Sequence, residues 1–142
     1  ALHWPLRIEQ VSARPRVIID TAHNDASMTA LCETLAPLKH RRRLLVFGTS
    51  KDKDAAAMLR ILSNGFDEAI LTRYTQNPRA LPVDQLSEIA ESNLTIPWRV
   101  SADPLHAWEA AREQVSDDDL ICVTGSVFLA AEMQAIIRQA SR

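Results

Sequence analysis

The sequence is short of glycine, cysteine and long apolar runs, and each shortage excludes a class of protein. Only three of its 142 residues are glycine and seven are proline, too few for a collagen-like or low-complexity chain. Cys32 and Cys122 provide neither the density of a secreted disulfide scaffold nor the spacing of a zinc site, so we expect buried thiols in a reducing cytoplasm. No apolar run approaches the roughly 20 residues of a membrane span, and no signal-peptide pattern opens the chain. We therefore expect a cytoplasmic protein without a membrane partner.

An excess of charge is also missing. Sixteen lysines and arginines against eighteen acidic residues give a formal net charge of −2, which provides no overall field for steering toward nucleic acid. The basic run at residues 39–43 precedes a predicted strand, at the sheet end opposite the expected site, and indicates a solvated turn rather than a phosphate patch. Trp4, Trp98 and Trp108 have no interleaved basic residues, so we expect them to pack rather than stack on bases. No nucleic-acid partner is predicted.

The sequence does contain a regular alternation of short β-branched runs and amphipathic stretches. Residues 17–20 read Val-Ile-Ile-Asp, typical of a strand that is buried on both faces of a parallel sheet. Further strands are predicted at 8–11, 44–47, 68–72, 97–100 and 120–123, and helices at 25–35, 54–62, 82–91, 104–114 and 127–138. The connections are short except for the polar loop at 73–82. The pattern predicts one α/β domain, a Rossmann-like three-layer sandwich whose mostly parallel sheet has about six strands and an antiparallel N-terminal edge strand.

Polar residues and two of the three glycines follow these predicted strands. In open α/β sheets, ligands bind beyond the carboxyl ends of the strands, and there the motif at 20–24 places Asp20 and His23. Asn24 in the same motif also suits the N-cap of the next helix. The other residues at this edge are Gly48, Ser50, Asp52, Thr72, Arg73, Ser101, Asp103, Thr124, Gly125 and Ser126. Short turns use the same residue types to cap helices, so position alone leaves both interpretations open.

Signatures of other chemistries are absent from the sequence. It contains no Gly-x-Ser-x-Gly around Ser126, no dinucleotide-binding Gly-x-Gly-x-x-Gly, and no phosphate loop of the form Gly-x₄-Gly-Lys-Ser/Thr. His3, His40 and His106 lie far apart without the spacing of metal ligands, so no metal site is predicted.

Five motifs stand in a fixed order along the chain. They are Trp-Pro-Leu-Arg-Ile-Glu at 4–9, Asp-Thr-Ala-His-Asn at 20–24, Phe-Gly-Thr-Ser-x-Asp-Lys-Asp at 47–54, Asn-Pro-Arg-Ala at 77–80 and Val-Thr-Gly-Ser at 123–126. Together they resemble the C-terminal domain of folylpolyglutamate synthase and dihydrofolate synthase, within the Mur ligase superfamily. Leu6 and Thr21 depart from the pattern, because each stands where the family usually has glycine.

The resemblance implies that residues 1–142 form the C-terminal lobe of a three-domain ATP-dependent ligase, and that the N-terminal substrate domain and the central ATPase domain are absent from this chain. In such ligases ATP phosphorylates a carboxylate of the substrate, here folate, and the amino group of glutamate attacks the acyl phosphate. Mg²⁺ is then held mainly by the missing central domain. We expect a monomer whose partners are glutamate and folate, and we expect the isolated chain to be inactive.

The resemblance also implies roles for individual residues. Arg7 corresponds to an arginine that reaches the triphosphate, a task suited to a rigid cationic fork. Asp20 corresponds to the residue that holds the ribose, and His23 to a catalytic and ATP-binding residue that orients the γ-phosphate or the amine. Ser126 corresponds to a residue that holds the incoming glutamate, whose carboxylates suit a helix N-terminus. Arg79 is the second candidate for binding that carboxylate.

Two alternatives remain open. The chain could be the C-terminal domain of a peptidoglycan Mur ligase, because residues 77–79 are close to the Asp-Asn-Pro-Arg that those enzymes use for the incoming amino acid. Against this, Gln76 replaces the aspartate, and His23 and Asn24 replace the more usual His-Thr-Pro. The other alternative is a freestanding nucleotide-binding or interaction module, which requires the native product to begin near Ala1.

Overall fold

A computed structural model of the chain describes residues 8–140, in which strands and helices alternate. The strands are β1 (Ile8–Ala13), β2 (Arg16–Asp20), β3 (Arg43–Phe47), β4 (Glu68–Leu71), β5 (Trp98–Val100) and β6 (Leu120–Thr124). The helices are α1 (Asp25–Leu35), α2 (Ala55–Leu62), α3 (Val83–Asn93), α4 (Pro104–Gln114) and α5 (Val127–Ala140). The predicted order of elements is confirmed, with boundaries that differ by one or two residues.

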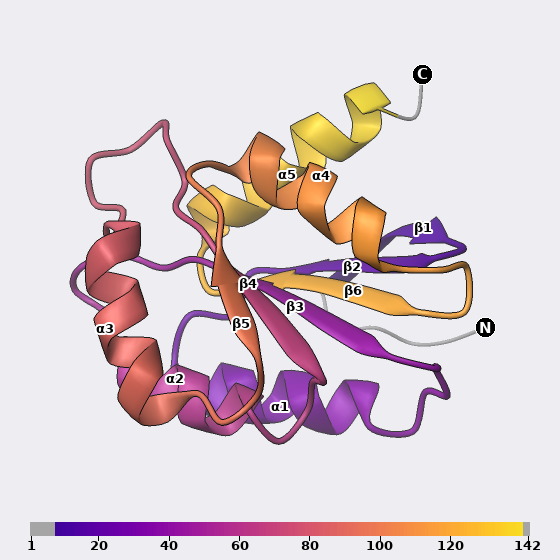
Figure 1. Cartoon of the computed structure of the whole chain (residues 1–142), viewed down its shortest axis with the longest axis horizontal. Coiled ribbons are helices and arrows are strands. Elements are labelled where there is room, and N and C mark those ends of the chain that lie inside the picture. Colours follow the sequence, from indigo (N-terminus) through magenta and orange to yellow (C-terminus); the bar gives the residue numbers. More distant parts are fainter. Residues whose placement is uncertain (1–7, 141–142) are drawn as a thin grey trace.

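The six strands form one sheet in the order β1-β2-β6-β3-β4-β5 (Figure 1). β1 is antiparallel to β2 and every other pair is parallel, which confirms the predicted fold class. The last strand, β6, lies between β2 and β3, so that Ile121 pairs with Val17 on one side and with Leu44 on the other. The carboxyl ends of β2, β6 and β3 are therefore neighbours, and so are the loops that follow them.

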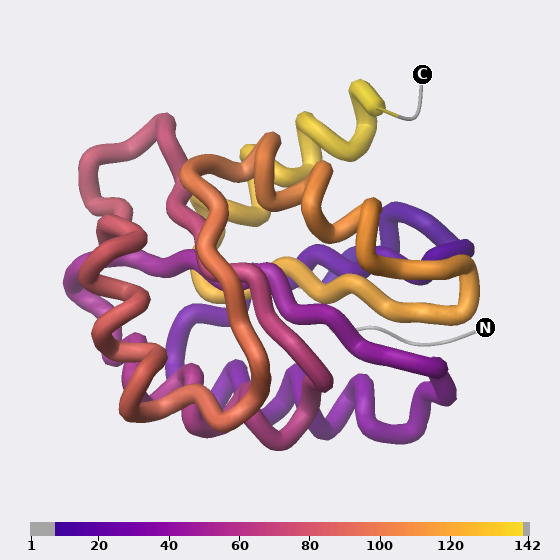
Figure 2. The backbone as a smooth tube through the Cα atoms, in the orientation of Figure 1, coloured from indigo at the N-terminus to yellow at the C-terminus, as the bar shows by residue number. Residues whose placement is uncertain are grey.

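Helices cover both faces of the sheet. α1, α2 and α3 lie on one face and α4 and α5 on the other, as the path of the chain shows (Figures 1 and 2). Side chains of β6 alternate between the two layers: Cys122 packs with Met28 of α1, whereas Val123 packs with Met133 of α5. Burial on both faces explains why the central strands consist of unbroken apolar runs.

The N-terminal edge strand is longer than predicted. β1 continues to Ala13, two residues beyond the predicted strand at 8–11, because a register shift after Gln10 lets Ser12 pair with Val17. Glu9 on this strand contacts α5, accepting a hydrogen bond of 2.5 Å from Gln134 and lying 3.5 Å from the guanidinium of Arg138. The edge strand is therefore joined both to its neighbour in the sheet and to the last helix.

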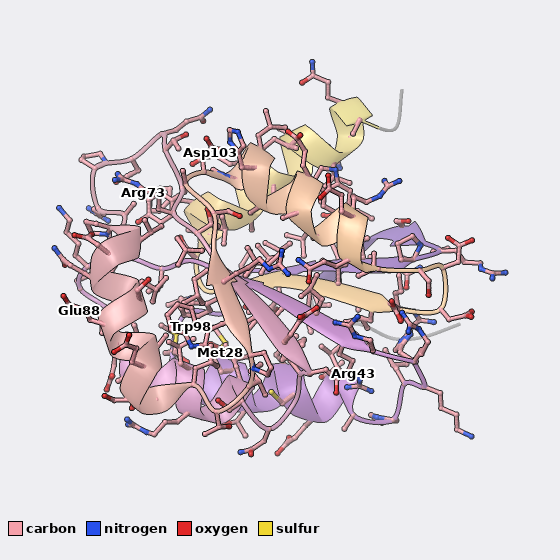
Figure 3. All side chains as sticks on the ribbon, viewed as in Figure 1. Met28, Arg43, Arg73, Glu88, Trp98 and Asp103 are labelled. Carbon is pink, nitrogen blue, oxygen red and sulfur yellow. The ribbon has the colours of Figure 1, made fainter. Side chains whose placement is uncertain are left out.

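The basic run at 39–43 lies in the connection before β3, where Lys39 and Arg41 are exposed as predicted, but its arginines are also paired. Arg41 makes a bidentate contact with Asp119, at 3.0 and 2.8 Å, and Arg42 pairs with Glu68. Arg43 donates to the carbonyl of Leu35 at the end of α1, and lies at the sheet end opposite Arg73 and Asp103 (Figure 3). These guanidiniums hold the amino end of the sheet together, because each finds an acceptor from a different part of the chain.

The cysteines and tryptophans serve packing. Burial raises the pKa of both thiols; Cys122 is fully buried, whereas Cys32 is only half-buried, less than predicted. Trp108 is buried beneath the guanidinium of Arg112, which lies 5.6 Å from the ring centre, and Trp98 packs against the core from β5. Trp4 lies outside the described residues. Within residues 8–140 no helix is long and apolar enough to cross a bilayer.

Candidate functional site

A pocket of about 220 Å³ opens at the carboxyl edge of the sheet. Its walls come from the loops after β2, β3 and β6, the first turn of α5, and the loop at 73–82. The lining residues are His23, Ser50, Asp52, Lys53, Arg79, Gly125, Ser126, Val127 and Phe128. Three of the residues singled out from the sequence, His23, Arg79 and Ser126, are thus brought to one cavity from positions more than forty residues apart in the chain.

Asp20 does not line this pocket. Its carboxylate is completely buried, and Oδ2 accepts hydrogen bonds from the backbone N–H of Ala22 at 2.8 Å and from Oγ1 of Thr124 at 2.9 Å. Although Asp20 ends its strand where ligands bind in such sheets, it is not exposed, because β6 lies directly beside β2 and brings Thr124 against the carboxylate. In this conformation Asp20 joins the ends of two strands.

His23 is exposed at the mouth of the pocket. Its Nδ1 lies 3.1 Å from the carbonyl oxygen of Thr21, and since a carbonyl can only accept, Nδ1 carries the proton. In the neutral imidazole with this tautomer, the other ring nitrogen, Nε2, is the acceptor. Thr21, which replaces the usual glycine, needs no special backbone here, because no non-glycine within residues 8–140 has a positive φ.

Asn24 caps α1, as the sequence predicted for this half of the motif. Its Oδ1 accepts from the backbone N–H of Ser27 at 2.9 Å, and the Ser27 hydroxyl accepts in return from the backbone N–H of Asn24. This reciprocal arrangement is a capping box, which satisfies N–H groups that the first turn of a helix leaves open. The Asp-x-x-His-Asn motif therefore divides into a strand-end link, an exposed imidazole and a helix cap.

Gly125 allows the loops after β3 and β6 to cross in contact. Its φ is +118°, and a Cβ at this position would lie 2.3 Å from the carbonyl oxygen of Gly48. Oγ1 of Thr49 donates to the Gly125 carbonyl at 2.8 Å, and the Gly125 N–H donates to Ala22 at 3.2 Å. Only glycine fits both the close approach and the positive φ, which is how glycines at this edge help to build the site.

The N-terminus of α5 supplies the positive end of a 14-residue helix to the pocket. Ser126 precedes it, and its hydroxyl oxygen accepts from the backbone N–H of Phe128 at 3.0 Å, so this serine is also a helix cap. Lys53 and Arg79 add two cations to the lining, against one carboxylate, Asp52, which lies 4.0 Å from Lys53. The balance of charge suits a ligand that carries carboxylate or phosphate groups.

The polar loop at 73–82 is held in place at several points. The Lys51 N–H donates to the Arg79 carbonyl at 2.8 Å, and Ser50 pairs with Ala80 in an antiparallel bridge. The hydroxyl of Tyr74 lies 2.6 Å from that of Ser50, and its ring is fully buried. This loop thus places Arg79 on the wall of the pocket.

Several lining and supporting residues were not singled out as site residues. Lys53 belongs to the motif at 47–54, and its position in the loop after β3 was the signal that could have identified it as a site residue. Phe128, Tyr74 and Glu132 gave no local signal, because their neighbours in space are distant in the sequence.

Other residues at the predicted edge lie outside this pocket. Thr72 is buried next to Gly48. Arg73 lies in the loop after β4, and Asp103 lies in the loop after β5 (Figure 3). Asp103 caps α4 and contacts His106. Arg7 lies outside the described residues. In the part of the chain from 8 to 140, no group of three histidine, cysteine or acidic side chains could hold a metal ion.

The sequence of this chain matches a known protein family. Residues 6–127 match the family described as "Mur ligase, glutamate ligase domain". The chain belongs to this family. The Mur ligase glutamate ligase domain thus accounts for most of its length, including every residue that lines the pocket except Phe128.

The chain is also similar to individual curated proteins and solved structures of this family. The chain is 32% identical over 134 residues to the folylpolyglutamate synthase of Lacticaseibacillus casei, covering 94% of this chain and 30% of that protein. It superposes with a TM-score of 0.85, at 29% identity, on a Mycobacterium tuberculosis folylpolyglutamate synthase complexed with ADP and AMPPCP, covering 96% of this chain and 33% of the other.

A bifunctional folylpolyglutamate synthase/dihydrofolate synthase with Mn, AMPPNP and L-glutamate bound gives a TM-score of 0.76 at 29% identity, with 94% of this chain and 32% of that one covered. The ligase domain therefore spans about a third of the length of the relatives that it matches.

Proposed function

We propose that this chain is the C-terminal lobe of an ATP-dependent ligase that adds L-glutamate to folate, and that its pocket receives the incoming glutamate. The observation that carries the proposal is the convergence of Arg79, Lys53 and the N-terminus of α5 on one small cavity. A dicarboxylic amino acid has the charge and size that such a cavity favours. The similarity to folylpolyglutamate synthases supports folate as the acceptor.

In this proposal each group performs a task that its chemistry allows. The guanidinium of Arg79 is a planar fork that pairs with a carboxylate through two parallel hydrogen bonds. The N–H groups and dipole at the start of α5, with the Ser126 hydroxyl, bind the same or the second carboxylate. When the amine attacks an acyl phosphate, a C–N bond forms, phosphate leaves, and the amine loses a proton that Nε2 of His23 can accept.

Nucleotide and metal binding are divided between this lobe and the rest of the ligase. The described residues do not fit a metal ion, and the sequence has no phosphate loop, so we assign Mg²⁺ and the phosphate-binding loop to the preceding domains. Arg7 as a contact to the triphosphate and Asp20 as a contact to the ribose stay predictions. We also propose that the ligase works as a monomer in the cytoplasm, within one-carbon metabolism.

The proposal is tested with the full-length protein that contains this chain. MgATP, L-glutamate and tetrahydrofolate should give ADP, phosphate and a folate extended by one glutamate, detected by mass spectrometry. Arg79→Ala should raise the KM for glutamate at least about tenfold, the loss expected for one charge-assisted pair. A product formed with a UDP-linked peptidoglycan precursor, and none with folates, would instead support the peptidoglycan alternative.

The isolated 142-residue chain should fold but release no ADP. Residues 8–140 form a six-stranded sheet, but the sequence lacks the phosphate loop on which phosphoryl transfer depends. Circular dichroism with a cooperative thermal transition checks the folding, and a coupled ADP assay checks the turnover. Glutamate-dependent ADP release by the isolated chain would show that the nucleotide site is misassigned.

A further inference from the structure

Glu132 is a nearly buried carboxylate on α5 that binds the loop at 73–82. Its oxygens accept hydrogen bonds from the Thr75 N–H at 3.0 and 2.8 Å, from Oγ1 of Thr75 at 2.7 Å, and from the Gln76 N–H at 3.1 Å. Only 8% of the residue is exposed. A carboxylate in such a place is costly unless donors surround it, and here one short stretch of loop supplies the donors.

A second contact from the same helix holds the neighbouring part of the loop. Phe128, four residues before Glu132 and therefore on the same side of α5, lies with its ring centre 5.2 Å from that of Tyr74. The Tyr74 hydroxyl in turn meets Ser50 on the wall of the pocket. Two successive turns of α5 thus fix residues 74–76, and the N-terminus of the same helix borders the pocket.

Arg79 lies at a second attachment of the same loop. The far side of the loop is joined to the segment after β3 through the Arg79 carbonyl and the bridge between Ser50 and Ala80. The Arg79 residue itself is exposed, so that its place on the pocket wall is set by its backbone rather than by packing. The distance from Arg79 to the start of α5 is therefore determined by how the loop is held at both ends.

From this arrangement we infer that Glu132 is a positioning residue for the incoming amino acid. By holding residues 75 and 76 against α5, it keeps Arg79 across the pocket from Ser126, so that both can contact one ligand. This rests on the proposed function of the pocket. Glu132 touches no substrate itself; it acts on the affinity for glutamate through the position of the loop.

The variant Glu132→Gln in the full-length ligase tests the inference. The amide keeps the size of the side chain but replaces one acceptor oxygen with an NH₂ group that faces N–H donors. The KM for glutamate should rise about tenfold, while the KM for ATP and kcat change less than threefold. Glu113→Gln, an exposed glutamate on the adjacent helix α4, is the matched control and should leave all three constants within twofold of wild type. An unchanged KM for glutamate in Glu132→Gln would overturn the inference, and so would an equal rise in both KM values.

A double-mutant cycle with Arg79→Ala separates this inference from the proposed function. If Glu132 acts through Arg79, Glu132→Gln should raise the glutamate KM no more than about twofold once Arg79 is gone. If Arg79→Ala alone leaves the glutamate KM unchanged, the proposed glutamate site fails. If Arg79→Ala raises that KM and the two substitutions multiply independently, only the positioning role fails.

Should Glu132→Gln not fold, Thr75→Val removes a single hydrogen bond from the same contact. It should raise the glutamate KM two- to threefold in the Arg79 background and not in the Arg79→Ala background. A wild-type glutamate KM in Thr75→Val would then contradict the inference.

Discussion

Oγ1 of Thr124 donates a 2.9 Å hydrogen bond to Oδ2 of Asp20, although 104 positions separate the two residues in the chain. The contact exists because β6 lies beside β2 and both strands end at the same level. The same oxygen of Asp20 accepts from the Ala22 N–H, so one carboxylate joins two strand ends to the loop that carries His23. Asp20 therefore helps to hold in place the loop that carries His23.

Asp20→Ala should lower the free energy of unfolding by about 2–4 kcal/mol, because it leaves a buried hydroxyl and a buried N–H without their acceptor. Asp20→Asn keeps one acceptor oxygen and should cost less than half as much. Urea denaturation of both variants measures the difference. If Asp20→Ala is as stable as wild type but has at least a tenfold higher KM for ATP in the full-length ligase, the role in holding the ribose is correct and the structural role is not.

Gly125→Ala should be strongly destabilising, by at least about 2 kcal/mol, because the residue has a positive φ and its new Cβ would meet the backbone of Gly48. Gly65→Ala is the matched control. Its Cβ would lie 3.1 Å from Sγ of Cys32, a side-chain atom that can shift, so the cost should stay near 1 kcal/mol. Equal losses for the two variants in thermal denaturation would contradict this account of the crossing loops.

His106 and Asp103 form a pH-dependent pair at the start of α4. The hydrogen bond between the Asp103 carboxylate and Nδ1 of His106 raises the pKa of His106 above 6.5. The His106 backbone N–H, followed by its ring, lowers the pKa of Asp103 below 3.8. NMR titration should show the raised histidine pKa, and Asp103→Asn should return it toward 6.5.

The effect of this pair on stability has a definite sign. A raised histidine pKa contributes stability below the unfolded pKa of about 6.5, and this is lost as the pH rises through the folded pKa. The lowered aspartate pKa contributes stability above the unfolded pKa of about 3.9, and this stability is lost as the pH falls through the folded pKa. The pair should therefore contribute most between about pH 4 and 6.5, by a small amount because both groups are accessible to solvent. A wild-type pH profile of stability in His106→Ala would contradict this.

Arg7→Ala is predicted to reduce kcat far more than it weakens nucleotide binding. A cation that stabilises a transferring phosphoryl group commonly accounts for about 10³- to 10⁵-fold in rate. The alternative is a surface pair with Glu9, and in the structure that carboxylate already contacts Gln134 and Arg138. Single-turnover kinetics of the full-length ligase at saturating ATP decide the question, and a rate within about threefold of wild type would identify Arg7 as a surface residue.

Much of the fold could be predicted from the sequence because its determinants are local. The unbroken apolar run before Asp20 indicates a strand buried on both faces, and Asn24 and Asp103 begin helices through hydrogen bonds to backbone groups three residues away. The same reasoning placed His23 and Ser126 beyond the strands. Each of these predictions depends only on residue type and on neighbours within a few positions.

Only the tertiary structure decided how these residues meet. The placement of β6 between β2 and β3 buries Asp20, and it brings Gly125 against Gly48. The link from Glu132 to Thr75 spans 57 positions, and the one from Arg41 to Asp119 spans 78. A hydrogen bond between distant residues leaves no periodicity in the sequence, because it depends on strand order and helix placement. The sequence by itself therefore determined the elements and the residues at their ends, whereas packing decided which of those residues face a ligand and which support the others from within.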